Sequence, residues 1–184
     1  MIIGIAGTLG AGKGTAVERI KSYGFSHYSS SGTLKHILTE RGLAHTRLNM
    51  STLANELNEN REGGILGYSH EMAVKNGDKN FILESIHRLS EAEYIKKIGG
   101  VILGIDTAIE LRYKRAFARQ EGEKDNVTFL QFKIDSERED EGKTGSGPNI
   151  KEVLKSADYV LFNNSNNIED FYRQIDEFVD RYNR

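Results

Sequence analysis

A glycine-rich segment near the amino terminus ends in a lysine and a threonine, which are residue types that bind phosphate. The segment, GTLGAGKGT over residues 7–15, directly follows the apolar run at residues 2–6. A glycine-rich loop between a buried strand and a helix directs several backbone N–H groups toward one point, where the helix dipole also favours an anion. The Lys13 ammonium is a cation for the β- and γ-phosphates of a nucleotide, and the Thr15 hydroxyl can reach a phosphate oxygen or a magnesium shell. We therefore predict a nucleotide phosphate site formed by Gly10, Ala11, Gly12, Lys13, Gly14 and Thr15.

This segment fits the pattern G-x-x-x-x-G-K, with one departure at the residue after the lysine. Ser or Thr is usual there, whereas this chain has Gly14 and carries the hydroxyl on Thr15. Gly-Lys-Gly-Thr in this setting resembles the phosphate loop of adenylate kinases and related nucleoside monophosphate kinases. The resemblance implies ATP and Mg²⁺ as cofactors and places Thr15 at the metal, and it leaves open whether Gly14 alters the metal ligation.

The composition excludes several other classes of protein. A chain of 184 residues favours one domain with its own core. Lys plus Arg total 25 against 27 Asp plus Glu, so we expect no extended nucleic acid as a partner. Without cysteine the chain has no disulfide, thiol nucleophile or cysteine-based zinc site. We expect no targeting segment, and no apolar run of about 18 residues occurs in the sequence. These features predict a soluble cytoplasmic protein without a membrane partner, either a monomer or a homodimer.

Five apolar runs alternate with segments long enough to form helices, which predicts an α/β fold. Continuous apolar character in four of the runs suits strands that are covered on both faces, as in a parallel sheet between helices. The second run is more polar, so we place it at an edge of the sheet. The predicted strands are Ile2–Ala6, Phe25–Tyr28, Phe81–Leu83, Val101–Ile105 and Tyr159–Phe162.

The resemblance implies a three-layer P-loop kinase fold with strand order 2-3-1-4-5. It also implies one domain over residues 1–184, with an acceptor-binding insertion at about 30–77 and a small lid at about 120–148. Ligands of such folds bind beyond the carboxyl ends of the strands. Ser90 and Glu93 have the spacing of a capping box, which predicts a helix that begins after the third strand.

Two further segments carry the resemblance toward an acceptor site. Residues 28–35, YSSSGTLK, look like the Ser-Thr-Gly-Asp-x-Leu-Arg segment of adenylate kinases, shortened by one residue. This implies that Ser31 and Gly32 approach an acceptor nucleoside monophosphate and that Lys35 binds its phosphate. The alternative for Ser-Ser-Ser-Gly is a helix-capping turn. Arg47 opens another helical stretch. The helix dipole disfavours a cation there unless a substrate phosphate or a neighbouring Glu compensates the positive charge of Arg47.

Residues 80–88, NFILESIHR, are similar to the Phe-Ile-Leu-Asp-Gly-Phe-Pro-Arg segment of adenylate kinases. A carboxylate at the carboxyl end of a buried strand can orient magnesium or its waters, and an arginine four residues later can clamp an acceptor phosphate. Glu84 and Arg88 fit these two roles, and a salt bridge between them is the alternative. The glutamine that reads the base in the family is not evident at Ala92 and Glu93, so base specificity cannot be inherited.

Three arginines share one face of the helix expected after the fourth strand, namely Arg112, Arg115 and Arg119. Such a charged face is usually solvated surface. Here it leads into the predicted lid, where adenylate kinases and dephospho-coenzyme A kinases keep arginines that close over the transferred group. The resemblance therefore favours Arg115 and Arg119 as catalytic residues together with Lys13 and Arg88, and it leaves Arg112 undecided.

Residues 157–164, ADYVLFNN, resemble the closing strand of dephospho-coenzyme A kinases, where the following loop passes the donor adenine. Asn163 and Asn164 either bond that base or form a turn. That family carries an Asp-x-Asp pair after its second strand to activate a hydroxyl acceptor, and this chain has none there. We therefore predict in-line transfer of the ATP γ-phosphoryl group to a nucleoside monophosphate or a related small phosphate ester. A dephospho-coenzyme A kinase is the alternative, and a nucleotide-binding regulator or slow NTPase switch is the alternative of another class.

Overall fold

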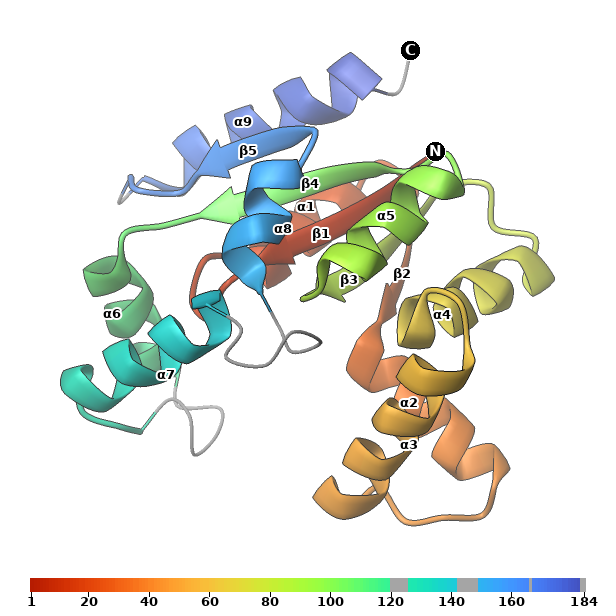
Figure 1. Ribbon diagram of the computed structural model, residues 1–184. Coiled ribbons are helices and arrows are strands. Elements are labelled where there is room, and N and C mark those ends of the chain that lie inside the picture. Colours follow the sequence, from red (N-terminus) through yellow and green to blue (C-terminus); the bar gives the residue numbers. More distant parts are fainter. Residues whose placement is uncertain (120–125, 142–148, 166, 183–184) are drawn as a thin grey trace.

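Five parallel strands form one sheet in the order β2-β3-β1-β4-β5 (Figure 1). The computed structural model describes residues 1–119, 126–141, 149–165 and 167–182. The predicted strand order and the edge position of the second strand are confirmed. The elements in chain order are β1 (Ile2–Gly7), α1 (Lys13–Lys21), β2 (Ser26–Ser29), α2 (Ser30–Glu40), α3 (Arg47–Asn60), α4 (Gly64–Lys75), β3 (Phe81–Ile86), α5 (Leu89–Lys97), β4 (Val101–Asp106), α6 (Ile109–Arg119), α7 (Phe129–Glu141), α8 (Ile150–Ser156), β5 (Tyr159–Phe162) and α9 (Ile168–Tyr182).

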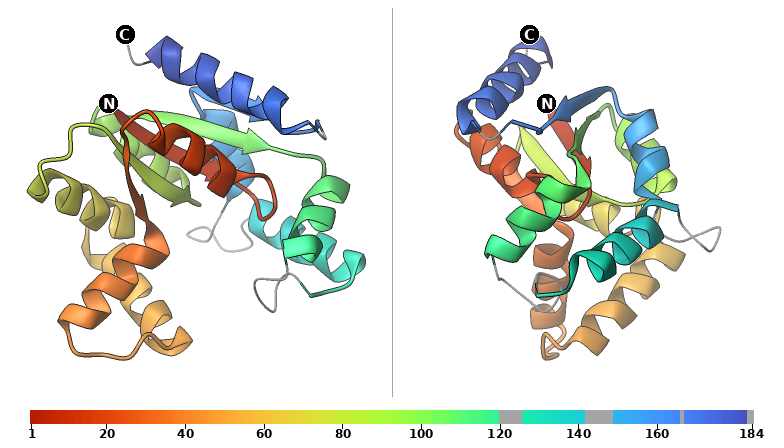
Figure 2. Two further views of the ribbon diagram at one scale, coloured as in Figure 1. Left: turned by 180° about the vertical axis from the view of Figure 1, so that it is seen from behind. Right: turned by 90° about the vertical axis from the view of Figure 1, so that its left-hand side faces the viewer.

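Helices cover both faces of the sheet. In the right-hand view of Figure 2, α1 and α9 lie on one side of the strands, and α5 and α8 lie on the other. Each face buries its own apolar cluster, because alternate residues of a strand point to opposite faces. Ile3 and Ile82 pack with Phe171 and Phe178 of α9, whereas Leu83 packs on the opposite face with Ile95 of α5. This arrangement explains why the central strands read as continuous apolar runs.

A register shift interrupts the pairing of β1 with β3 beside the phosphate loop. Ile5 pairs with Glu84, but Ala6 pairs with Ile86, so Ser85 is an extra residue in the β3 strand. Ser85 has a φ of 80° and is the one non-glycine residue with positive φ in the part of the chain that the structure describes. That conformation costs an L-residue about 1–2 kcal/mol. The bulge returns Ile86 to the face that carries Leu83 and leaves Glu84 on the face of Ile82 and α1.

Helices α2, α3 and α4 project from the β2 edge of the sheet, and α6 and α7 lie on the opposite side of the molecule (Figure 1). The α2–α4 unit encloses a separate small core that includes Leu38, Leu53 and Leu57. It occupies the range predicted for the acceptor-binding insertion. The predicted lid at about 120–148 lies partly outside the described residues, and its described part is mainly α7. No helix within the described ranges is both long and apolar enough to cross a bilayer.

The start of α5 corrects the expected capping box at Ser90 and Glu93. Arg88 is the N-cap residue, and the Glu91 carboxylate accepts hydrogen bonds from the backbone N–H groups of His87 (2.7 Å) and Arg88 (3.1 Å). The helix therefore begins earlier than the serine indicates, because the buried Glu91 carboxylate accepts from the N–H groups of the N-cap residue and of the residue before it. Both Ser90 and Glu93 are exposed.

Candidate functional site

Backbone conformation explains two of the glycines in the loop between β1 and α1. Gly10 and Gly12 have φ angles of 78° and 109°, which disfavour any residue with a Cβ atom. A Cβ on Gly10 would overlap the carbonyl oxygen of Arg112, and one on Gly12 would lie 2.5 Å from Nδ2 of Asn163. At Gly14 a Cβ would meet nothing within 4 Å. The loop is therefore packed tightly against α6 and the end of β5 and is open at Gly14.

Lys13, the first residue of α1, folds back over this loop. Its Nζ donates to the carbonyl oxygens of Gly7 (2.8 Å) and Thr8 (3.0 Å). The Thr8 hydroxyl oxygen is buried and has no hydrogen-bond partner within the described part of the chain. A bound phosphate could replace these two acceptors of the Lys13 ammonium group, because a charged phosphate binds a cation more strongly than neutral carbonyl oxygens do.

The loop lines a cavity of about 480 Å³ together with residues from β3 and α6. Glu84 contributes from the end of β3, and Arg115 and Arg119 contribute from α6. Parallel strands bring their carboxyl ends to one edge, which is why these distant segments meet. The structure therefore brings together the predicted residues Lys13, Thr15, Glu84, Arg115 and Arg119 around one opening.

The Glu84 carboxylate is held by a residue of the neighbouring strand. His27 Nε2 donates to Glu84 Oε2 over 2.9 Å, and both side chains are mostly buried. This hydrogen bond holds the pKa of the Glu84 carboxyl below its ordinary value. Glu84 is therefore ionised at neutral pH, as a group that orients a cation or its waters must be.

Two of the three arginines of α6, Arg112 and Arg115, have different environments. Arg112 is 6% exposed and donates to the carbonyl oxygen of Thr107 (3.1 Å) and the hydroxyl of Ser136 in α7 (2.7 Å). Arg115 donates to the carbonyl oxygens of Asn163 (3.0 Å) and Ser165 (3.2 Å), and burial lowers the pKa of its guanidinium. Arg112 thus joins α6 to α7, whereas Arg115 lines the cavity beside the loop after β5.

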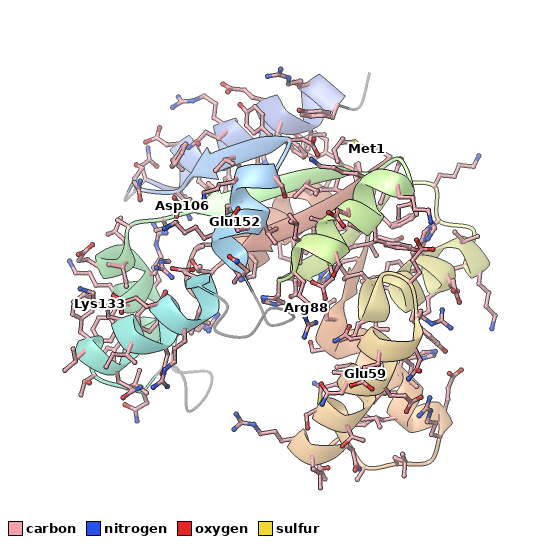
Figure 3. All side chains as sticks on the ribbon, viewed as in Figure 1. Met1, Glu59, Arg88, Asp106, Lys133 and Glu152 are labelled. Atoms are coloured by element: carbon pink, nitrogen blue, oxygen red, sulfur yellow. The ribbon has the colours of Figure 1, made fainter. Side chains whose placement is uncertain are left out.

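A second cavity of about 940 Å³ lies between α3, α5 and α8. Three of its lining residues are labelled in Figure 3: Glu59 on α3, Arg88 at the cap of α5 and Glu152 on α8. Arg88 also donates to Glu91 Oε1 over 3.3 Å. Among the predicted acceptor-binding residues, Arg88 lines this second cavity, and the others line neither cavity.

A family model described as the AAA domain matches residues 6–128, which is more than half of the chain. The chain belongs to the AAA domain family. This region includes the phosphate loop, Glu84, Arg88, Arg115 and Arg119, so the family assignment covers both sides of the first cavity.

Two relatives match this AAA domain chain over nearly its full length. The UPF0200 protein of Pyrobaculum aerophilum is 25% identical over 95% of this chain and 94% of its own. The UPF0200 protein of Methanocaldococcus jannaschii is 25% identical over 97% of this chain and 89% of its own.

Solved structures show that the chain has a P-loop kinase-like fold. A shikimate kinase from Bacteroides thetaiotaomicron superposes with a TM-score of 0.63 over 98% of both chains, at 12% identity. A dephospho-CoA kinase from Campylobacter jejuni gives a TM-score of 0.56 over 98% of this chain and 96% of its own, at 20% identity. At these identities the likeness establishes the fold alone.

Magnesium fits the donors of the first cavity. Mg²⁺ usually keeps several waters and takes only one or two protein ligands in addition to substrate phosphates. The Thr15 hydroxyl and the Glu84 carboxylate line the same cavity as the phosphate loop. Within the described residues no group of three or more His, Asp or Glu side chains forms a separate metal cage. The Thr15 hydroxyl and the Glu84 carboxylate are thus oxygen donors of the kind that a nucleotide-bound magnesium takes.

The other predicted acceptor residues are exposed on the α2–α4 unit. Ser31, Gly32 and Lys35 lie in the first turns of α2, where Ser29 Oγ accepts from the Gly32 N–H over 3.0 Å. The capping turn considered as an alternative is thus present. Arg47 is the first residue of α3 and is exposed. These four residues line neither of the two cavities described above.

Sequence reasoning missed His27 and Thr107 as residues that shape the site, and for Asn163 it considered only a contact with the donor base or a turn. Thr107 Oγ1 (3.0 Å) and Asn163 Nδ2 (2.9 Å) both donate to the carbonyl oxygen of Ala11 and so fix the loop from behind. The Asn164 side chain accepts from the Ala108 N–H. His27 and Glu84 share a face only because of the register of the β2–β3 ladder, which the sequence does not show. No local signal connects Asn163 with a loop 152 residues away.

Proposed function

We propose that this chain transfers the γ-phosphoryl group of ATP to a small phosphate-bearing acceptor, with nucleoside monophosphates as the first candidate class. One observation carries the proposal: a single cavity is lined by the loop lysine, a carboxylate and two arginines from a separate helix. A phosphate loop alone suits any nucleotide-binding protein. A carboxylate and additional cations around it suit transfer of the terminal phosphoryl group.

The proposed roles follow from charge and position. Lys13 would exchange its two carbonyl acceptors for the β- and γ-phosphates, and backbone N–H groups from Gly10 to Thr15 would hold the phosphate oxygens. Thr15 and Glu84 would hold the magnesium shell. When bound, Mg²⁺ neutralises charge that develops on the phosphates. Arg115 and Arg119 would stabilise charge on the transferred group. Transfer would proceed in line, without a covalent enzyme intermediate.

The acceptor would bind between the α2–α4 unit and α5. Arg88 lines the large cavity there, and its guanidinium can bind a phosphate in a bidentate manner. Ser31, Gly32, Lys35 and Arg47 are proposed contacts from the resemblance to adenylate kinases, and their exposure leaves them accessible to a substrate.

Dephospho-coenzyme A is the second candidate acceptor, because residues 157–164 resemble the closing strand of dephospho-coenzyme A kinases. A regulator or slow switch is the alternative outside this class. It would use the loop but would have no acceptor to stimulate ADP formation.

The test is a steady-state assay of ADP formation with ATP, Mg²⁺ and a panel of acceptors. The panel contains ribo- and deoxynucleoside monophosphates and dephospho-coenzyme A. Acceptor-dependent ADP formation supports the kinase, ATP loss without acceptor dependence indicates a switch, and neither indicates a structural protein. Lys13→Ala should lower turnover by several powers of ten, whereas Lys75→Ala on the exposed end of α4 should not. Near-normal turnover of the Lys13 variant would refute the assignment.

A further inference from the structure

A histidine on an edge strand contacts the carboxylate of the proposed magnesium site. His27 Nε2 and Glu84 Oε2 are 2.9 Å apart, and the exposed fractions of the two side chains are 24% and 16%. The pair links residues that are 57 positions apart in the chain. It lies at the same edge of the sheet as the phosphate loop, because Glu84 also lines the loop cavity.

Strand register explains why these two side chains meet. His27 pairs with Ile82 in the parallel β2–β3 ladder, so His27 and Ile82 share a face and Glu84, two residues further, shares it as well. The bulge at Ser85 falls immediately after Glu84 and leaves this alignment intact. The backbone therefore fixes the approach of His27 to Glu84 independently of a ligand.

The contact uses only one of the two carboxylate oxygens. Oε2 accepts from His27, and Oε1 takes no part in this contact. The Ser30 hydroxyl donates to the backbone carbonyl of Glu84 over 3.2 Å, which further anchors the residue. A carboxylate with one fixed oxygen has lost most of its rotamer freedom, so its other oxygen has a defined direction.

We propose that His27 is a positioning residue that holds Glu84 so that the second carboxylate oxygen faces the magnesium that accompanies ATP. The inference rests on the proposed function, because it concerns the metal shell of the same nucleotide. His27 would act through Glu84 and would touch neither the nucleotide nor the metal. Outer partners of this kind typically change metal affinity by about 10–100-fold.

The experiment measures Mn²⁺ binding to the complex of the protein with a non-hydrolysable ATP analogue, by the electron paramagnetic resonance signal of free Mn²⁺. His27→Ala and His27→Asn should each raise the Mn²⁺ dissociation constant about 10-fold or more. His27→Gln should stay close to wild type, because its side-chain N–H reaches as far as Nε2 of histidine. The matched control is His36→Ala, which removes an exposed His–Glu contact of 3.5 Å on α2.

A double variant separates positioning from a structural role. If His27 acts through Glu84, Glu84→Gln should itself weaken Mn²⁺ binding, and adding His27→Ala should cause no further loss. Wild-type Mn²⁺ affinity in both His27→Ala and His27→Asn would overturn the inference, even if their melting temperatures fall. An equal loss from His27→Ala in the Glu84→Gln background would also overturn it. Failure of the wild type to bind the ATP analogue would instead refute the proposed function.

Discussion

The carbonyl oxygen of Ala11 is held by two buried side chains, and this contact predicts a specific non-additive loss of stability. Thr107 and Asn163 donate to that oxygen over 3.0 and 2.9 Å, and they are 4% and 7% exposed. Thr107→Val and Asn163→Ala each remove one donor and leave the carbonyl with the other. A net hydrogen bond is worth about 1 kcal/mol, so each variant should lose about 1–2 kcal/mol, with Asn163→Ala at the upper end because it also leaves a small void.

The double variant leaves the buried carbonyl without either donor. An unsatisfied buried polar group costs about 1–3 kcal/mol, so the double variant should lose at least about 1 kcal/mol more than the sum of the single losses. Urea unfolding monitored by circular dichroism measures these free energies of unfolding. Asn164→Ala is the matched control, since the neighbouring asparagine is exposed and accepts from the Ala108 N–H, not from the loop. Simple additivity of the two losses would refute the shared role of the Ala11 carbonyl.

Two other predictions concern the loop and the packing of α1. Gly10→Ala should destabilise the protein by more than about 1 kcal/mol, because of its φ of 78° and the overlap with Arg112, whereas Gly14→Ala in open space on α1 should stabilise it by about 0.5–1 kcal/mol. Equal melting temperatures of the two variants would contradict this. The hydrogen bonds from Arg19 (2.8 and 2.6 Å) lower the pKa of the Asp176 carboxyl. The paired carboxylate should therefore stabilise the folded protein fully at pH values above its ordinary pKa of 3.8, and this stabilisation should be lost as the pH falls below that value. Acid titration of the wild type and Asp176→Asn should show the two free energies of unfolding converge at low pH, and a constant difference would refute the assignment.

Local sequence determined much of the fold. Apolar runs fixed the five strands, because a buried parallel strand must be apolar on both faces. The second run contains Ser26 and His27, and its polar character correctly predicted an edge strand. The predicted start of α5 was wrong. Ser90 and Glu91 are both residue types that occur at a helix start, and only the burial of Glu91 shows which of them caps this helix.

The sequence by itself also determined the phosphate loop, since glycine spacing, a lysine and a strand-to-helix transition are all local properties. Only the tertiary structure decided what surrounds that loop. The contact of Asn163 with Ala11 and that of His27 with Glu84 span 152 and 57 residues. Such contacts depend on sheet order, on the register shift at Ser85 and on the approach of α6, which are set by packing of the whole core. A local pattern carries no information about distances of that kind, so these partners became visible only when the strands were placed side by side.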